Sequence, residues 1–331
     1  MPPLTPPTVV LAAAQSIIGP VPRGDVALIR NAERPAQVLV ARDHDAQLAL
    51  AANADILFGD VQPDVLDIAT RLRWVQSVGA GVDRLLPALA GRDVVLTSAK
   101  GGVVGSHLAE HAMALLLSLT RGVSRSQRRP GWGWDHRIAI RATQWELTDR
   151  SMLIVGFGGA GQALARRARG FEMPRIVAVD PAPPDAATAA LVDDIVHPDQ
   201  LDAHLGAFDV VVLTVPLTPA TAGLLDDRRI ALMKPGAVVI NVSRGGLIDD
   251  VALRGALASG HLSGAGLDVL AEEPIAADDE WWDLPNVVLT PHIAGGSPRR
   301  ASRVVAQFCD NLRRWDDGVA LDGVYDPARG F

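Results

Sequence analysis

The sequence predicts an α/β protein of two domains with parallel β-sheets, one domain being inserted into the other. Short apolar runs alternate with helical patterns over almost all of the 331 residues, an order typical of parallel sheets covered by helices. A glycine-rich turn near the middle separates a buried strand from a helix, and a helical pattern over Arg299–Trp315 closes the chain. We expect that last helix to return to the first domain, so that residues 1–101 and 297–331 form one domain and residues 102–296 the other.

The first domain begins after a proline-rich tip. Its expected strands are Val9–Ala13, Val26–Ile29, Ala54–Phe58, Trp74–Ser77 and Val94–Thr97, and Pro63–Leu72 has a helical pattern. Small residues follow the fourth strand, in the stretch SVGAGVD over 77–83. Their backbone N–H groups could bind an anion, although a simple strand-to-helix turn explains the stretch equally well.

Two adjacent glycines, Gly101 and Gly102, predict a hinge, because glycine absorbs large dihedral changes. The helix Gly105–Leu119 follows and contains the H-x-x-E-H pattern with His107, Glu110 and His111. Two histidines four residues apart share a helix face and could ligate zinc. A zinc protease needs a further ligand downstream and an open cleft, so we predict no metal site here.

Residues 121–150 are polar, irregular in pattern and rich in arginine and tryptophan. Such a segment could line a groove for single-stranded nucleic acid. Tryptophan and arginine are also favoured at protein interfaces. Because the net charge of the chain is −7, we predict an extended arm that packs on a second subunit to form a homodimer, and no nucleic-acid partner.

The glycine-rich turn joins the expected strand Met152–Val155 to a helix and fits G-x-G-x-x-G. Gly156 permits the tight turn, Gly158 lets a pyrophosphate approach the backbone, and Gly161 lets the helix lie close to the strand. The N–H groups at the start of that helix, including those of Gly159 and Ala160, would hold the phosphates. The sequence therefore predicts a Rossmann-like domain that binds a dinucleotide.

The expected strand Arg175–Val179 follows and ends in Asp180, 22 residues after Gly158. A carboxylate at that distance suits the two ribose hydroxyls of NAD and repels the 2′-phosphate of NADP. We therefore predict NAD as the cofactor, although Arg175 stands near Asp180 in sequence and could favour NADP.

The remaining strands of the second domain are expected at Asp209–Thr214, Ala237–Val242, Ala265–Val269 and Val287–Thr290. Helices are expected at Leu224–Met233 and Val251–Ser259, and a loop at Ala182–Ala190. Together with the first domain's sheet, this pattern predicts two Rossmann-like or flavodoxin-like domains.

Three polar residues, Arg244, Glu273 and His292, each follow or end an expected strand of the second domain. An arginine fork can hold a carboxylate, and a histidine can donate a proton to a carbonyl oxygen. A neighbouring carboxylate would orient the imidazole and favour its charged form. Taken singly, they could be a surface ion pair, a loop carboxylate and a hydrogen-bonded histidine at a strand end.

The composition indicates the class of protein and the compartment in which we expect it. Hydrophobic residues make up 48% of the chain, which indicates a globular protein. The single cysteine, Cys309, cannot form a disulfide within the chain, so we expect a reducing, cytoplasmic compartment. The N-terminus lacks the basic start of a signal peptide and no apolar run reaches membrane-spanning length, so we expect no membrane association.

The sequence resembles the D-isomer-specific 2-hydroxyacid dehydrogenase family over nearly its whole length. The matching stretches are SVGAGVD (77–83), AEHAMALLLSLTR (109–121), GFGGAG (156–161), VPLTPATAGL (215–224), NVSRGGLID (241–249), GLDVLAEEP (266–274) and LPNVVLTPHIAG (284–295). The separations of 29 residues from Arg244 to Glu273 and 19 from Glu273 to His292 are ones that this family uses.

The resemblance implies a role for each matching residue. His292 would be the acid/base with Glu273 as its partner, and Arg244 would bind the substrate together with the backbone N–H groups of Val78 and Gly79. Asp268 would face the nicotinamide. Further cofactor contacts would come from Thr214, Val215, Pro216 and Gly295, and the tryptophan-bearing arm would form the dimer.

We therefore expect an NAD-dependent enzyme that interconverts a 2-oxo acid and a D-2-hydroxy acid, with domain closure about Gly101-Gly102 and Ser297-Pro298. The alternative is a binding protein and not an enzyme: a regulator of the same fold that senses NADH. A relative that oxidises phosphite is a third possibility. The complete set of Arg244, Glu273 and His292 argues against the regulator.

Overall fold

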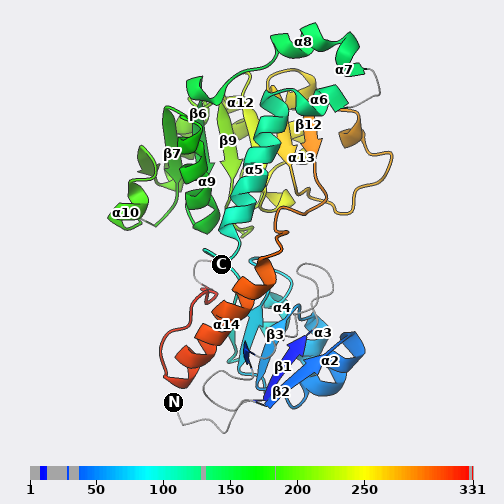
Figure 1. Ribbon diagram of the computed structural model, residues 1–331, viewed down its shortest axis with the longest axis vertical. Coiled ribbons are helices and arrows are strands. Elements are labelled where there is room, and N and C mark those ends of the chain that lie inside the picture. The colour runs from blue at the N-terminus through cyan, green and yellow to red at the C-terminus, as the bar shows by residue number, and fades with distance from the viewer. Residues whose placement is uncertain are drawn as a thin grey trace. The chain divides into compact units, whose positions relative to one another are not determined.

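The computed structural model describes residues 8–12, 28–29, 37–127, 132–182, 184–327 and 330. The chain divides into two compact units, unit 1 with Met1–Val104 and Gly296–Phe331, and unit 2 with Gly105–Gly295. Each unit is built on a parallel sheet with helices, so the predicted α/β class is confirmed (Figure 1).

Unit 1 contains a five-stranded parallel sheet in the order β2-β1-β3-β4-β5. The strands are β1 (Thr8–Ala12), β2 (Gln37–Ala41), β3 (Ile56–Gly59), β4 (Trp74–Ser77) and β5 (Val95–Thr97). The short helices α2 (His44–Ala51), α3 (Pro63–Ile68) and α4 (Leu86–Leu89) pack with alternate strand residues in one apolar cluster.

The last long helix, α14 (Arg300–Asp316), belongs to unit 1, as the sequence predicted. Its Phe308 ring stacks on Phe58 of β3 with centroids 4.4 Å apart, and it also contacts Trp74 of β4 at 5.1 Å. Since Leu57 and Val75 point into the cluster with α2 and α3, the sheet is covered on both faces.

Two expectations in unit 1 were wrong. The run Val26–Ile29 is not a strand where it is described, because Leu28 and Ile29 are helical. Leu28 is 58% exposed whereas Ile29 is fully buried, and a short apolar run cannot by itself distinguish a strand from a helix. The helix predicted over Pro63–Leu72 ends at Ile68, and the strand β2 was not predicted.

Unit 2 contains a seven-stranded parallel sheet in the order β12-β11-β10-β9-β6-β7-β8. The strands are β6 (Ser151–Val155), β7 (Arg175–Val179), β8 (Asp194–Val196), β9 (Val210–Leu213), β10 (Val238–Asn241), β11 (Gly264–Leu267) and β12 (Val287–Leu289). The chain leaves β6 toward β7 on one side and returns through β9 on the other, so the strand order reverses at β6.

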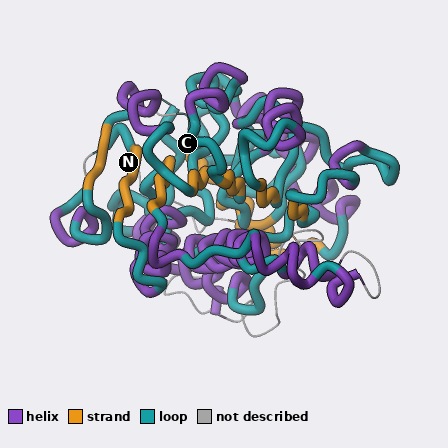
Figure 2. The backbone as a smooth tube through the Cα atoms, turned by 90° about the horizontal axis from the view of Figure 1, so that it is seen from above, coloured by secondary structure: helices purple, strands orange, loops and turns teal. Residues whose placement is uncertain are grey.

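Helices lie on both sides of the strands (Figure 2). The helices α5 (Gly105–Thr120) and α9 (Gly159–Gly170) share one apolar cluster with Met152 and Ile154 of β6. The helices α11 (Leu201–Leu205), α12 (Asp227–Leu232) and α13 (Asp250–Ala258) share a second cluster with Leu153 and Val155. This alternation along one strand is what a sheet buried on both faces requires.

Two segments of unit 2 that were expected to be irregular contain short helices. Residues 121–150 form α6 (Val123–Gln127), α7 (Trp132–Asp135) and α8 (Arg137–Ala142) in their described parts. The expected loop Ala182–Ala190 contains α10 (Ala186–Ala189), which starts where the Asp185 carboxylate accepts the Thr188 N–H at 2.9 Å. Helices this short lack the repeated apolar spacing on which sequence prediction depends.

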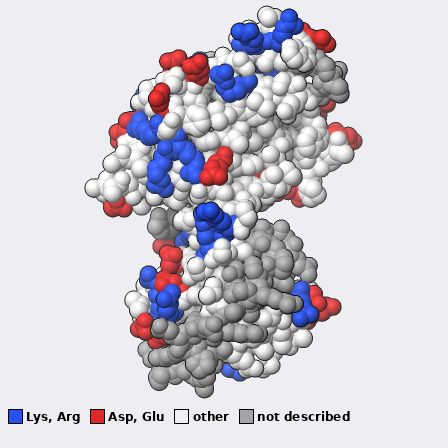
Figure 3. All heavy atoms as spheres, in the orientation of Figure 1, with Lys and Arg blue, Asp and Glu red and all other residues white. Residues whose placement is uncertain are grey.

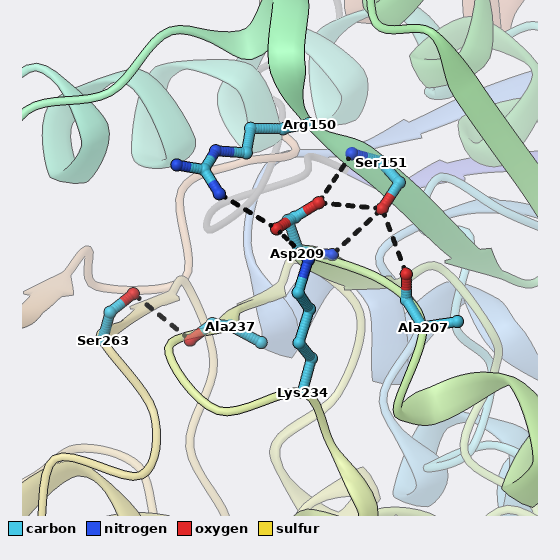
Figure 4. Close-up of polar contacts among 7 residues, drawn as sticks. All are labelled: Arg150, Ser151, Ala207, Asp209, Lys234, Ala237 and Ser263. Atoms are coloured by element: carbon cyan, nitrogen blue, oxygen red, sulfur yellow. Dashed lines mark hydrogen bonds and ion pairs between the residues drawn. The ribbon is translucent and has the colours of Figure 1, made fainter.

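A polar cluster fastens the amino-terminal ends of the strands in unit 2 (Figure 4). The Asp209 carboxylate accepts hydrogen bonds from Lys234 at 2.7 Å, from Arg150 at 3.2 Å and from both the N–H and hydroxyl of Ser151. Burial works against the charged form of Asp209, but these donors outweigh it and lower its pKa to about 2.

On the face drawn in Figure 3, basic and acidic side chains lie interspersed over the described surface. Within the described ranges, no helix has both the length and the apolar character needed to cross a membrane.

Candidate active site

The predicted site residues of unit 2 follow the carboxyl ends of adjacent strands. In sheet order, His292 comes after β12, Asp268 after β11, Arg244 after β10, Thr214 after β9, Gly156 after β6 and Asp180 after β7. Because all of these strands are parallel, the six positions share one edge of the sheet. The edge includes the point where the strand order reverses, which is where open α/β sheets bind ligands.

The glycine-rich turn has the geometry of a phosphate cradle. Gly156 has a φ of +98°, and a side chain there would collide with the Thr214 backbone at 2.8 Å. A side chain on Gly161 would run into the Gly156 carbonyl, whereas one on Gly158 would meet nothing within 4 Å. The first N–H groups of α9, from Gly159 onward, have no acceptor inside the helix. Open space in front of free donors fits a dinucleotide pyrophosphate.

Asp180 is fixed beside this turn. Its carboxylate accepts the Phe157 N–H at 2.8 Å and the Ala182 N–H at 2.9 Å. Arg175 begins β7 at the opposite end of the strand, and its guanidinium lies 4.7 Å from the Phe208 ring centroid. The acid therefore stands next to the cradle without that arginine.

Thr214 closes the other side of the turn. Its N–H donates to the Val155 carbonyl at 2.8 Å and its hydroxyl to the Gly156 carbonyl at 2.6 Å. Val215 also approaches Gly156, since a side chain there would lie 2.8 Å from Val215 Cγ1. Thr214, Val215 and the following Pro216 are half-buried beside the cradle.

Arg244 is held in a turn after β10. The buried Asn241 amide donates to the Arg244 carbonyl at 2.8 Å, and its oxygen accepts the Ser243 N–H at 3.0 Å. Arg244 Nη1 donates to the Ser243 carbonyl at 2.8 Å. Gly245 follows and packs so closely on the Leu270 backbone that no side chain would fit. The turn that carries the arginine is thereby placed against the loop after β11.

That loop carries Glu273, and the structure brings Glu273 and His292 together. Glu273 Oε2 lies 2.8 Å from His292 Nδ1, while its Oε1 accepts the Leu270 N–H at 2.9 Å. His292 is 49% and Glu273 35% exposed at the side chain, so both remain open to a ligand. With Nδ1 held by the carboxylate, Nε2 is the ring atom left to exchange a proton with a substrate.

His292 adopts a left-handed backbone conformation with a φ of +53°. This conformation is uncommon for a non-glycine residue and several-fold enriched in histidine. It allows three consecutive N–H groups to converge on Asp268: that of His292 donates to the Asp268 carbonyl at 2.9 Å, and those of Ile293 and Ala294 donate to its carboxylate at 2.9 and 2.8 Å. These three hydrogen bonds fix the loop that ends at Gly295 to Asp268, which is itself 2% exposed.

The predicted substrate loop lies in unit 1. The Val78 N–H donates to the Gly59 carbonyl at 3.3 Å and the Gly79 N–H to the Ser77 hydroxyl at 3.1 Å. The Val78 carbonyl accepts a hydrogen bond from the guanidinium of Arg300 at 3.0 Å, and burial lowers the pKa of Arg300 to about 10. Arg300 could not be predicted from the sequence, because an arginine in the first turn of an amphipathic helix gives no signal that it is buried.

The H-x-x-E-H residues have other contacts. Glu110 pairs with Arg167 at 2.7 Å, and that hydrogen bond lowers the pKa of Glu110. His111 Nε2 lies 2.8 Å from the Thr290 hydroxyl. Among the residues that the structure describes, no three histidine, cysteine or acidic side chains gather where they could hold a metal ion.

Comparisons with known proteins show which family the chain is similar to. Residues 113–294 match the family model described as D-isomer specific 2-hydroxyacid dehydrogenase, NAD binding domain. The D-3-phosphoglycerate dehydrogenase of Mycobacterium tuberculosis is 34% identical over 293 residues, covering 86% of this chain and 52% of that protein. The glyoxylate reductase of Pyrococcus furiosus is 36% identical over 253 residues, covering 75% and 74%.

Among solved structures, a D-isomer specific 2-hydroxyacid dehydrogenase family protein from Aeromonas salmonicida has a TM-score of 0.78 at 31% identity, covering 96% of this chain and 99% of that one. The chain spans about half the length of the phosphoglycerate dehydrogenases that it matches. The family that the sequence resembles is therefore confirmed. This chain belongs to the D-isomer specific 2-hydroxyacid dehydrogenase family and carries its NAD-binding domain.

Proposed function

We propose that the protein interconverts a 2-oxo acid and a D-2-hydroxy acid with NAD as the hydride carrier. The observation that carries this proposal is the 2.8 Å pair of His292 and Glu273 on the strand edge that also holds the glycine cradle. The relatives that are named glyoxylate reductase, (S)-sulfolactate dehydrogenase and D-3-phosphoglycerate dehydrogenase support this class of substrate.

In the direction of reduction, His292 donates a proton from Nε2 to the carbonyl oxygen at C2 of the substrate. NADH, held at the glycine turn beside Asp180, would supply the hydride that the two-electron reduction at C2 requires. Glu273 accepts a hydrogen bond from Nδ1 and so keeps Nε2 directed at the substrate oxygen. In the direction of oxidation the neutral ring accepts the hydroxyl proton, and the same carboxylate stabilises the imidazolium that forms.

Arg244 binds the substrate carboxylate in this proposal. Arg244 is half-buried and its side chain is oriented by the hydrogen bond from Nη1 to the Ser243 carbonyl, so its remaining N–H groups can be directed at a carboxylate. The N–H groups of Val78 and Gly79, which the resemblance implied as further carboxylate donors, donate within unit 1 to the Gly59 carbonyl and the Ser77 hydroxyl, so this proposal relies on Arg244. These contacts do not select the side chain of the 2-oxo acid, because they are made to the carboxylate and the C2 oxygen, which all such acids share.

NADH oxidation with a panel of 2-oxo acids tests the proposal. Loss of NADH absorbance with one or more acids, abolished by His292→Ala while NADH binding persists, is the expected result. An NADH-sensing regulator would bind NADH and consume it with none of the acids. Oxidation of phosphite in the presence of NAD would identify the third alternative.

We also propose that the protein is a homodimer through residues 121–150. Trp134 of α7 is 78% exposed and Ile138 of α8 is 68% exposed, and both lie in this segment. Large exposed apolar side chains that lie close together in the sequence favour an interface. Sedimentation of the protein and of an Ile138→Glu variant tests this proposal, since a charge at a buried interface would yield monomers.

A further inference from the structure

A chain of hydrogen bonds connects α5 to the loop that carries His292. His111 Nε2 lies 2.8 Å from Thr290 Oγ1 and 3.4 Å from Asp268 Oδ1, and the Thr290 hydroxyl donates to the same Asp268 oxygen at 2.6 Å. Asp268 in turn accepts the N–H groups of residues 292–294. Each step is a short contact between groups that are mostly buried, the His111 side chain being 19% and the Asp268 side chain 1% exposed.

The protons in this chain can be assigned from the chemistry of the groups. A hydroxyl has one hydrogen, and the carboxylate of Asp268 can only accept. The Thr290 hydrogen is therefore committed to Asp268, so the hydroxyl oxygen must accept from His111. It follows that His111 carries a proton on Nε2 and that the direction of donation runs from the helix to the aspartate.

We propose that His111 is a positioning residue for the reaction, acting through Thr290 and Asp268 on the backbone of His292. This inference rests on the proposed function. The left-handed backbone of His292 is held by Asp268, and Asp268 keeps its orientation because Thr290 and His111 occupy its remaining side. Loss of the His111 donor would free the Thr290 hydroxyl to rotate and loosen the carboxylate, so that the imidazole would move relative to Glu273.

The assignment also accounts for a pattern that could be mistaken for a metal motif. The histidine that would be the second zinc ligand of H-x-x-E-H instead donates to Thr290, and Glu110 pairs with Arg167 on the neighbouring helix. In this assignment His111 therefore supports the loop of His292, and Glu110 connects α5 to α9 through its ion pair with Arg167.

The first test compares His111→Leu, which removes the donor, with His111→Gln, whose amide nitrogen can take the place of Nε2. We expect His111→Leu to lower kcat by about tenfold to a hundredfold, the loss expected from a small displacement of a catalytic group, with little change in NADH affinity. His111→Gln should recover most of the loss. His261→Leu is the control, because His261 contacts the Ile230 carbonyl elsewhere in unit 2.

The second test is a double-mutant cycle with Thr290→Val, which removes the bridging hydroxyl, and Thr290→Ser, which keeps it. If His111 acts through Thr290, His111→Leu combined with Thr290→Val should cost no more than the larger single change. Full additivity of the two effects would overturn the proposal. If His111→Leu does not fold, the Thr290→Val and Thr290→Ser pair still decides whether the hydroxyl bridge matters.

A third readout needs neither substrate nor turnover. In the apo-protein labelled with ¹⁵N in its histidine rings, we expect the His292 Nδ1 and Nε2 signals to change in His111→Leu and to stay at their wild-type positions in His111→Gln. Unchanged signals in His111→Leu would contradict the proposal. If the wild-type protein reduces no 2-oxo acid, the proposed function fails, whereas these signals still test the hydrogen-bond chain separately.

Discussion

Nδ1 of His292 lies 2.8 Å from Oε2 of Glu273, although the two residues are on loops that follow different strands. The pair is preorganised, because Leu270 holds the second oxygen of Glu273 and Asp268 holds the backbone of His292. Such an arrangement leaves little reorganisation for the moment of proton transfer.

Removal of the imidazole should therefore slow the proposed proton transfer strongly while leaving the binding of cofactor unchanged. We expect His292→Ala to lower kcat by about 10²- to 10⁴-fold, the usual contribution of general acid–base catalysis. Glu273→Gln, which keeps a hydrogen-bond partner of similar shape but removes its charge, should retain more activity than His292→Ala. Steady-state kinetics and NADH fluorescence titration measure both. Equal kcat in wild type and His292→Ala would exclude the proposed acid/base.

Cofactor choice should depend on Asp180. We expect Asp180→Ala to shift the ratio of kcat/KM for NADPH over NADH upward by about tenfold or more, equivalent to ~1.4 kcal/mol, because the carboxylate no longer repels a 2′-phosphate. The matched control is Arg175→Ala, since Arg175 lies at the far end of β7. A shift in Arg175→Ala as large as in Asp180→Ala would show that the acid is not the selective group.

Two glycines of the same turn should respond differently to alanine. Gly158→Ala introduces a methyl group into open space, so the protein should fold with normal thermal stability but bind NADH more weakly, because the methyl occupies the path of the pyrophosphate. Gly161→Ala forces a methyl group against the Gly156 carbonyl and should lower the melting temperature. Melting curves and NADH titration of both variants check this. Equal NADH affinity in Gly158→Ala and wild type would argue against the cradle.

Acid should remove the stabilisation that Asp209 provides. Its pKa is depressed from 3.8 to about 2 in the folded protein, so the contribution is fully present above pH ~4 and is lost as the pH falls toward 2. At neutral pH the shift corresponds to about 2 kcal/mol of the free energy of unfolding. We expect Asp209→Asn to be less stable than wild type at pH 7, with the difference shrinking below pH 4.

Denaturant unfolding at several pH values measures that difference. The exposed Asp278→Asn serves as a control and should change the free energy of unfolding little at any pH. A wild-type and Asp209→Asn difference that stayed constant from pH 7 to pH 2 would contradict the account.

Much of the architecture could be predicted because the parallel strands are continuous apolar runs that end in small or polar residues. Trp74–Ser77 and Arg175–Val179 were predicted with their observed bounds, and His292 and Glu273 were predicted as a pair. The strand β8 was missed because its three residues include an exposed aspartate and too few apolar positions. Leu28 and Ile29 were assigned to a strand because their run is too short to show a helical period.

The supporting contacts of the site could not be predicted. Asp268 was predicted to face the cofactor, and that stays a prediction; the contacts of its carboxylate with Thr290 and with two backbone N–H groups were not foreseen. Those contacts depend on the left-handed conformation of His292, which a non-glycine residue does not announce in sequence. Arg300 was missed for a similar reason, since its hydrogen bond to Val78 joins residues far apart along the chain.

In unit 2, the polar cluster around Asp209 lies at the amino-terminal ends of the parallel strands, and the proposed site residues lie at their carboxyl ends. Buried apolar strand residues therefore separate a substitution at one end of the strands from the residues at the other end. We therefore expect changes in the loops after the strands to leave the hydrogen bonds of Asp209 in place. Under the proposed function, a change of substrate through those loops would cost little folding stability.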